Sequence, residues 1–140
     1  MDKLLIITGG SKGIGSGIVQ AYLANGYQVI SISRTKNNHP SFANITQINF
    51  DLGDSIGAAK TIANILLTIN PTTLNRLVLI NNAGTLGEIN TIEKIEPTDI
   101  QHTINLNTVT PLTLTATFIQ HTQQWQCVKK VINISSGAAY

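Results

Sequence analysis

A glycine-rich segment near the start of the chain, TGGSKGIG at residues 8–15, has the composition of a phosphate-binding loop. It directly follows the apolar run LLII, and apolar residues at helical spacing come after it. Glycines let a backbone turn sharply and approach a phosphate, and the free N–H groups of a following helix attract negative charge. We therefore expect Gly9 at the strand exit, Gly13 at a bound pyrophosphate and Gly15 where the helix packs on the sheet.

The elements that would position this loop alternate along the chain. Short apolar runs predict buried strands at residues 4–8, 27–33, 45–51, 76–84 and 128–136, the fourth running into a turn. Helical spacing predicts helices from the glycine loop to Asn25-Gly26, over 56–69, and from Pro97 to about Gln120. This alternation predicts an α/β fold: a Rossmann-like, doubly wound parallel sheet of about five strands, in one domain over residues 1–140. Ligands of such sheets bind beyond the carboxyl ends of the strands, where the glycine loop lies.

The composition is that of a weakly charged protein. Hydrophobic residues make up 42% and charged residues 11%, against about 25% charged residues in an average globular protein. The net charge of +2 and the pI of 8.8 are too small to indicate nucleic-acid binding, and the basic pair Lys129-Lys130 has no interleaved aromatics. A weakly charged surface protects poorly against association, so we expect a homo-oligomer.

The number of cysteines and the length of the apolar runs indicate the cellular compartment to expect. The single cysteine, Cys127, excludes an internal disulfide and a cysteine-based metal cluster. The apolar runs are too short for a signal peptide or a bilayer span. We therefore expect a cytoplasmic protein that contacts no membrane, and we expect no metal site.

Four motifs occur in order along the chain. They are Thr8-Gly9-x3-Gly13-Ile14-Gly15, NNAG at 81–84 after the fourth strand, INLN at 104–107 within a helix, and INISS at 132–136 on the fifth strand. The glycine spacing of the first motif differs from that of the commoner dinucleotide-binding fingerprint, Gly-x-Gly-x2-Gly. The motif also lacks the Gly-Lys-Ser/Thr that ends the phosphate-binding loop of nucleotide hydrolases. Together the motifs resemble the short-chain dehydrogenase/reductase family over essentially the whole chain. The stretch INISSGAA is similar to the sepiapterin-reductase-like branch of that family.

The resemblance implies a nicotinamide dinucleotide and a small carbonyl or alcohol substrate. It implies cofactor contacts at Gly9, Ser11, Lys12, Gly13, Ile14, Gly15, Arg34, Asp51, Leu52, Asn82, Ala83 and Gly84. Asp51, with Leu52, matches the position that binds the adenine amino group. Two catalytic residues are implied: Ser136 orients the carbonyl, and Asn105 holds a kinked helix and a water of the proton relay. Ser135 is the alternative to Ser136.

The end of the second strand discriminates between the two nicotinamide cofactors. An acidic residue there would accept a hydrogen bond from a free 2′-hydroxyl and repel a 2′-phosphate. This chain has Ser33-Arg34 instead, and Lys12 of the glycine loop faces the same region. Two cations without an acid between them favour a 2′-phosphate, which arginine binds through two parallel hydrogen bonds. We therefore predict NADP(H), with NAD(H) as the alternative.

The family's proton donor, a tyrosine followed by x3-Lys, is not found in these 140 residues. Tyr22, Tyr27 and Tyr140 have no lysine at that offset, and we expect Tyr140 to be a loop residue. The chain thus resembles the N-terminal, cofactor-binding half of a reductase, and we expect it to bind cofactor with little or no turnover. A non-catalytic nucleotide-binding or interaction module is the alternative, and a degenerate product that folds only as an oligomer is the third possibility.

Several other polar residues are expected to be structural. We expect surface roles for His39, His102 and His121, and a packing role for Trp125. No motif places a histidine to activate Cys127. The threonines of the helix over 108–117 are expected to donate to carbonyls of their own helix.

Overall fold

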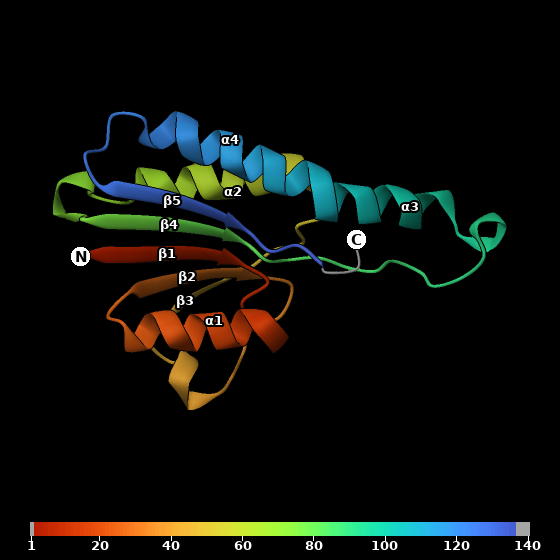
Figure 1. The fold of residues 1–140 in the computed structure, drawn as a ribbon, viewed down its shortest axis with the longest axis horizontal. Coiled ribbons are helices and arrows are strands. Elements are labelled where there is room, and N and C mark those ends of the chain that lie inside the picture. Colours follow the sequence, from red (N-terminus) through yellow and green to blue (C-terminus); the bar gives the residue numbers. More distant parts are fainter. Residues whose placement is uncertain (1, 137–140) are drawn as a thin grey trace.

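A computed structural model of the protein describes residues 2–136, so the prediction for Tyr140 lies outside the described residues. Its centre is a parallel five-stranded sheet with the order β3-β2-β1-β4-β5 (Figure 1). Leu5 of β1 aligns with Val29 of β2 on one side and with Val78 of β4 on the other. The strands are β1 Lys3–Thr8, β2 Gln28–Ser33, β3 Thr46–Asn49, β4 Arg76–Asn81 and β5 Val128–Asn133. The predicted doubly wound α/β fold is confirmed.

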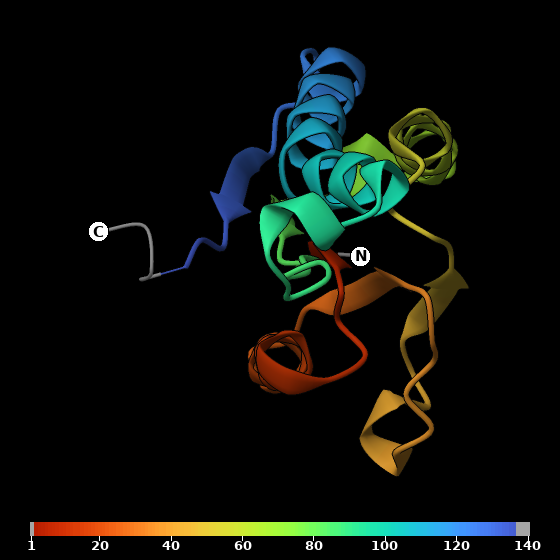
Figure 2. The same cartoon turned by 90° about the vertical axis from the view of Figure 1, so that its right-hand side faces the viewer.

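Helices cover both faces of the sheet. Helix α1 (Gly13–Ala24) lies on one face, while α2 (Ser55–Leu67) and α4 (Thr110–Thr122) lie side by side on the other (Figures 1 and 2). Short 3-10 turns occur at Pro40–Phe42, Pro71–Thr73 and Ile92–Lys94. Among the helices of residues 2–136, none has the length and apolar character needed to cross a bilayer.

The core has two halves because successive side chains of a strand point to opposite faces. On β1, Leu4 and Ile6 pack toward α2 and α4, whereas Leu5 and Ile7 pack toward α1. All four side chains are fully buried, as expected of a central parallel strand. The position of β1 fixes the start of the glycine loop, because Thr8 is the last residue of this strand.

The predicted helix from Pro97 to about Gln120 is confirmed in extent, but it is not a uniform α-helix. It consists of α3 (Pro97–Ile104), a π-helical segment (Asn105–Val109) and α4. Pro111 has no N–H to donate to the carbonyl four residues earlier, and its ring would clash there. A wider turn before Pro111 relieves this conflict. The π-helical segment therefore lies directly before the turn that contains Pro111, the second residue of α4.

The prediction that the threonines of this helix donate to carbonyls of their own helix holds for some of them and not for others. Thr113 and Thr117 donate to the carbonyl oxygens of Val109 and Thr113, at 2.7 and 2.9 Å, as predicted. Thr110 is buried and donates instead to the Leu52 carbonyl at 2.6 Å. This bond links the end of the π-helical segment to the loop after β3.

Two predicted strands are shorter than expected at their carboxyl ends. Residues 50–51 and 134–136 leave the sheet, although Phe50 N still donates to the Ser33 carbonyl and Ile134 N to the Asn81 carbonyl. Asp51 turns away because its carboxylate accepts from Gly53 N at 2.9 Å. The polar ends of β3 and β5, the two outer strands, thus become loops on the side of the sheet where the strands have their carboxyl ends.

Candidate functional site

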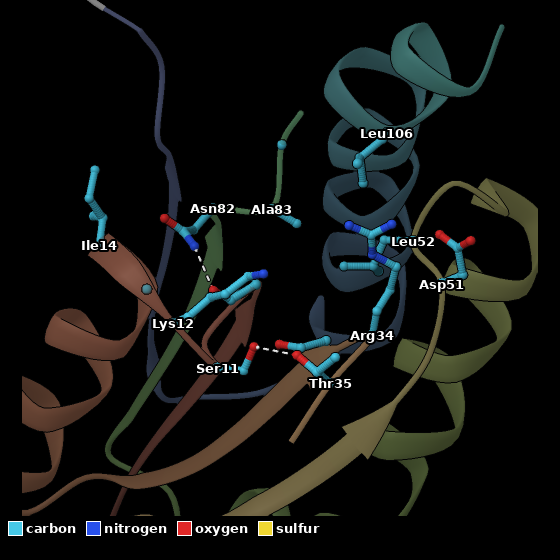
Figure 3. A pocket seen from close by; sticks show the side chains of 14 residues that line it. Ser11, Lys12, Ile14, Arg34, Thr35, Asp51, Leu52, Asn82, Ala83 and Leu106 are labelled. Atoms are coloured by element: carbon cyan, nitrogen blue, oxygen red, sulfur yellow. Dashed lines mark hydrogen bonds between the residues drawn. The ribbon is translucent and has the colours of Figure 1, made fainter. Parts of the chain in front are cut away.

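A cavity of about 540 Å³ lies at the carboxyl ends of the strands (Figure 3). Ser33 and Thr35 from the end of β2 and Leu106 from the π-helical segment contribute to its wall. With them the structure brings together every predicted cofactor residue except Gly13: Gly9, Ser11, Lys12, Ile14, Gly15, Arg34, Asp51, Leu52, Asn82, Ala83 and Gly84. Residues from widely separated parts of the sequence therefore border one space.

The glycine loop has the conformation that its sequence suggests. Gly9 and Gly13 have φ values of +67° and +56°, a region that side chains with a Cβ rarely adopt. A Cβ at Gly13 would meet no atom within 4 Å, so the backbone there is open to a ligand although Gly13 does not line the cavity. At Gly15 a Cβ would meet the Gly9 carbonyl oxygen and would lie 2.6 Å from Asn82 Nδ2. Gly15 thus allows the first turn of α1 to pack closely against the backbone of Gly9 and the side chain of Asn82.

The amino end of α1 is suited to an anion. Its N-cap, Lys12, makes no side-chain capping hydrogen bond, and the first turn holds no acidic residue. The first N–H groups of a helix have no partner within it and give that end a partial positive charge. Because Gly13 beside them is open, these groups make this end of α1 suited to bind a phosphate.

A hydrogen-bond network holds the glycine loop against the loop after β4. The Thr8 hydroxyl oxygen accepts from the N–H groups of Asn82 and Ala83, at 2.9 and 3.0 Å. In return, Asn82 Nδ2 donates to the carbonyl oxygens of Thr8 and Gly9, at 3.1 and 3.0 Å. The Asn82 side chain therefore shapes the cavity wall. Sequence reasoning included Thr8 in the glycine-loop motif but assigned it no role of its own.

Two cations reach into the cavity from different elements. Figure 3 shows the side chains of Lys12, from the glycine loop, and Arg34, from the end of β2, extending into the same space. Both residues are exposed. The Ser11 and Thr35 hydroxyls lie 3.3 Å apart and join the two loops (Figure 3). This end of the cavity therefore favours a ligand that carries more than one negative charge.

A second cavity of about 730 Å³ adjoins the first, and both are lined by Asn82, Ala83 and Gly84. Ser135 and Ser136 line the second cavity, as do apolar side chains from the loop after β4 and from α4. Asn105 lies in the π-helical segment and is half-buried, but it does not line either cavity. The structure therefore places Ser136 in the lining of the second cavity and Asn105 outside the lining of both cavities.

Asn81 links three of the elements that line the second cavity. Its side chain is 4% exposed and donates to Asn133 Oδ1 at 2.8 Å and to Thr115 Oγ1 at 3.2 Å. These bonds connect β4, β5 and α4 at the point where the serines begin. Sequence reasoning assigned cofactor contacts to the other three residues of the NNAG motif and gave Asn81 no role.

A parallel sheet with helices on both faces, and a glycine loop and cavity at its carboxyl edge, define a Rossmann-like nucleotide-binding domain. The sequence model of the family described as "short chain dehydrogenase" matches residues 3–140. The chain belongs to the short-chain dehydrogenase family.

Comparisons with individual proteins agree with this family. Benzil reductase ((S)-benzoin forming) from Bacillus cereus is 36% identical, over 97% of this chain and 57% of that protein. Sepiapterin reductase from Bos taurus is 28% identical, over 97% of this chain and 57% of its own length. The solved structure of ElxO with NADP bound has a TM-score of 0.76 and 29% identity, over 97% of this chain and 56% of that one. The chain thus spans little more than half the length of these relatives.

Proposed function

We propose that this protein is an NADP(H)-dependent oxidoreductase acting on a small carbonyl or alcohol. The observation that supports this most directly is the first cavity, where a glycine loop, an uncapped helix end and two cations converge. Family membership supports the nicotinamide dinucleotide as the class of cofactor. When bound, the cofactor would supply or accept the hydride.

Each predicted residue has a proposed task in this site. The backbone of the glycine loop and the start of α1 would hold the pyrophosphate, and Asp51 with Leu52 would border the adenine. Asn82, Ala83 and Gly84 would border the adenosine side of the cofactor. Ser136, in the second cavity, would orient the substrate carbonyl by a hydrogen bond. Asn105, which lines neither cavity, would act through the helix that it belongs to.

Lys12 and Arg34 support NADP(H) over NAD(H). Both line the cavity, and the residue before Arg34 at the end of β2 is a serine, which does not repel a 2′-phosphate. ElxO, the neighbour described above, was solved with NADP. We therefore expect the chain to bind NADPH more tightly than NADH.

Replacing Arg34 with aspartate is expected to weaken NADPH binding by about tenfold, because hydrogen bonds to charged groups contribute more than neutral ones. NADH, which has no 2′-phosphate, should be affected by about twofold or less on the same scale. Titration of each variant with both cofactors, monitored by cofactor fluorescence, gives the ratio of the NADPH and NADH affinities.

Lys36 offers a matched control for this experiment. It is an exposed lysine on the same loop that does not line the cavity, so Lys36→Asp makes the same charge change away from the site. An equal loss of NADPH and NADH in Arg34→Asp would contradict the assignment of the 2′-phosphate. Absence of binding by the unaltered chain to either cofactor at millimolar concentration would overturn the proposed function.

We propose that the 140 residues alone bind cofactor with little or no turnover, because they contain no Tyr-x3-Lys pair to donate the proton. The name of the Bacillus cereus relative makes benzil a suitable first assay substrate. Cofactor binding without turnover also fits a non-catalytic nucleotide-binding module. Turnover of benzil by this chain would show that a proton donor other than Tyr-x3-Lys operates.

We further propose that the protein is a homo-oligomer. Leu112 and Ile119 of α4 lie about two helical turns apart, on the same face of the helix, and are 68% and 51% exposed. Together with the low charge of the chain, such side chains favour association. Sedimentation velocity should show a species larger than 15.0 kDa, and a monomer at all concentrations would contradict the proposal.

A further inference from the structure

Asn37, in the loop after β2, makes hydrogen bonds through all four of its polar groups. Its backbone N–H donates to Gln47 Oε1 at 2.8 Å, and its carbonyl oxygen accepts from Gln47 Nε2 at 2.9 Å. Its side-chain Oδ1 accepts from His39 N at 2.9 Å, and its Nδ2 donates to the Ser11 carbonyl oxygen at 2.8 Å. Because Gln47 belongs to β3, this one residue joins β3 and the glycine loop to the loop after β2.

The segment over residues 34–37, here called the tethered loop, is attached to the glycine loop at a second point. The hydroxyl groups of Ser11 and Thr35 lie 3.3 Å apart. Ser11 therefore contacts the tethered loop through its side chain and through its carbonyl oxygen, and it is only 9% exposed. With Gln47 on the other side, the tethered loop is held between the glycine loop and β3.

The two cations of the first cavity are sequence neighbours of these contacts. Lys12 directly follows Ser11, and Arg34 directly precedes Thr35. Both cationic side chains are exposed and extend into the same space (Figure 3). Long side chains of this kind have many rotamers, so burial in the core does not fix their charged ends. The backbone positions from which they start therefore set how far apart the two charges can lie.

We propose that Asn37 is a positioning residue for recognition of the 2′-phosphate, and that it acts by holding Arg34 at a set separation from Lys12. The inference rests on the proposed function, in which these two cations bind that phosphate. Neither Asn37 nor Gln47 lines the cavity, so their effect would reach the ligand through the tethered loop.

The part of the site proposed for the pyrophosphate has a separate support. Asn82 Nδ2 donates to the carbonyl oxygens of Thr8 and Gly9, and these bonds do not involve the tethered loop. Release of the tethered loop would therefore leave the beginning of the glycine loop in place. NADH, which lacks the 2′-phosphate, should for this reason depend much less on Asn37 than NADPH does.

Replacing Asn37 with alanine tests this role, because it removes the bonds to Ser11 and His39. NADPH should bind about tenfold more weakly, the equivalent of one or two lost hydrogen bonds, while NADH should stay within about twofold. Adenosine 2′,5′-bisphosphate, which carries the same phosphate, should show the loss seen with NADPH. Cofactor fluorescence measures the first two affinities, and isothermal titration calorimetry the third.

Gln47→Leu provides a second, independent variant. It removes both bonds to the backbone of Asn37 but leaves the Asn37 side chain in place, so it should also weaken NADPH selectively, by about fivefold or more. If one of the two variants does not fold, the other decides the question. Asn38→Ala is the matched control, because Asn38 is the adjacent exposed asparagine and does not line the cavity. It should leave the affinities for both cofactors unchanged.

A double variant shows whether Asn37 acts through Arg34. Substitutions that affect the same interaction are not additive. With Arg34→Ala already present, Asn37→Ala should weaken NADPH binding only about twofold further. A further loss as large as that of Asn37→Ala alone would show that Asn37 acts elsewhere, and would overturn the proposed role.

The possible outcomes separate this inference from the proposed function. Selective loss of NADPH and of the bisphosphate in Asn37→Ala and Gln47→Leu is the expected result. Equal weakening of NADPH and NADH, or unchanged affinity for NADPH, would overturn the positioning role while the proposed function stands. If the unaltered chain binds neither cofactor, the proposed function is overturned and the inference with it.

Discussion

Replacing Gly15 with alanine is expected to lower the free energy of unfolding by about 3 kcal/mol, because the new methyl group would overpack a closed contact. Its Cβ would meet the Gly9 carbonyl oxygen and would lie 2.9 Å from the Gly9 carbonyl carbon and 2.6 Å from Asn82 Nδ2. Two of these atoms belong to the backbone of the glycine loop, which would have to move. The loop would then lose the position of its N–H groups, and NADPH binding should weaken at least about tenfold.

Gly17, in the same helix, is the matched control. A Cβ at Gly17 meets no atom within 4 Å, and the residue is exposed in α1. Gly17→Ala should therefore raise the free energy of unfolding by about 0.5–1 kcal/mol, since glycine is the less favourable residue within a helix. Denaturant unfolding and NADPH titration of both variants give the comparison. Unaltered stability in Gly15→Ala would contradict the close contact at that position.

Replacing Thr8 with valine is the second change from which a large effect is expected. The two side chains have nearly the same shape, but valine has no oxygen to accept from Asn82 N and Ala83 N. Thr8 is 2% exposed, and the second methyl group of valine would take the place of the hydroxyl, so both donors would lose the partner that they have in this structure. The free energy of unfolding should fall by about 3 kcal/mol, the cost of leaving two donors without their acceptor.

The variant Thr8→Ser distinguishes the contribution of the hydroxyl to stability from that of the methyl group. Thr8→Ser keeps the acceptor and removes only a methyl group, so it should cost about 1 kcal/mol. Urea unfolding of the two variants, with NADPH titration as a second measurement, would show whether the hydroxyl holds the glycine loop in place. A larger loss in Thr8→Ser than in Thr8→Val would show that packing, and not hydrogen bonding, determines the role of this residue.

The sheet could be predicted because its strands are short apolar runs that alternate with helical spacing. β1 and β4 are buried on both faces, so their composition is continuous and distinct from that of the helices. The ends of β3 and β5 were extended too far, since Asp51 and Ile134 continue a strand pattern after the ladder has ended. The π-helical segment was not visible in the periodicity, because it depends on how one proline is accommodated.

The glycine loop and the residues around the first cavity were found because each follows a strand in a short, ordered motif. Thr8 begins the first motif, but it was given no role of its own, because its partner Asn82 is 74 residues away in the sequence. The two residues come together only because the topology places the carboxyl ends of β1 and β4 side by side.

The bonds between Asn82 and the glycine loop have a consequence for the energetics of recognition. Because the amide holds the carbonyl oxygens of Thr8 and Gly9, the loop is ordered by the fold before any ligand arrives. The conformational entropy of that ordering is then lost once, when the chain folds, and not again at each binding event. A preorganised loop of this kind removes the cost of ordering the loop from the free energy of binding, so a larger part of the phosphate contacts appears in the affinity.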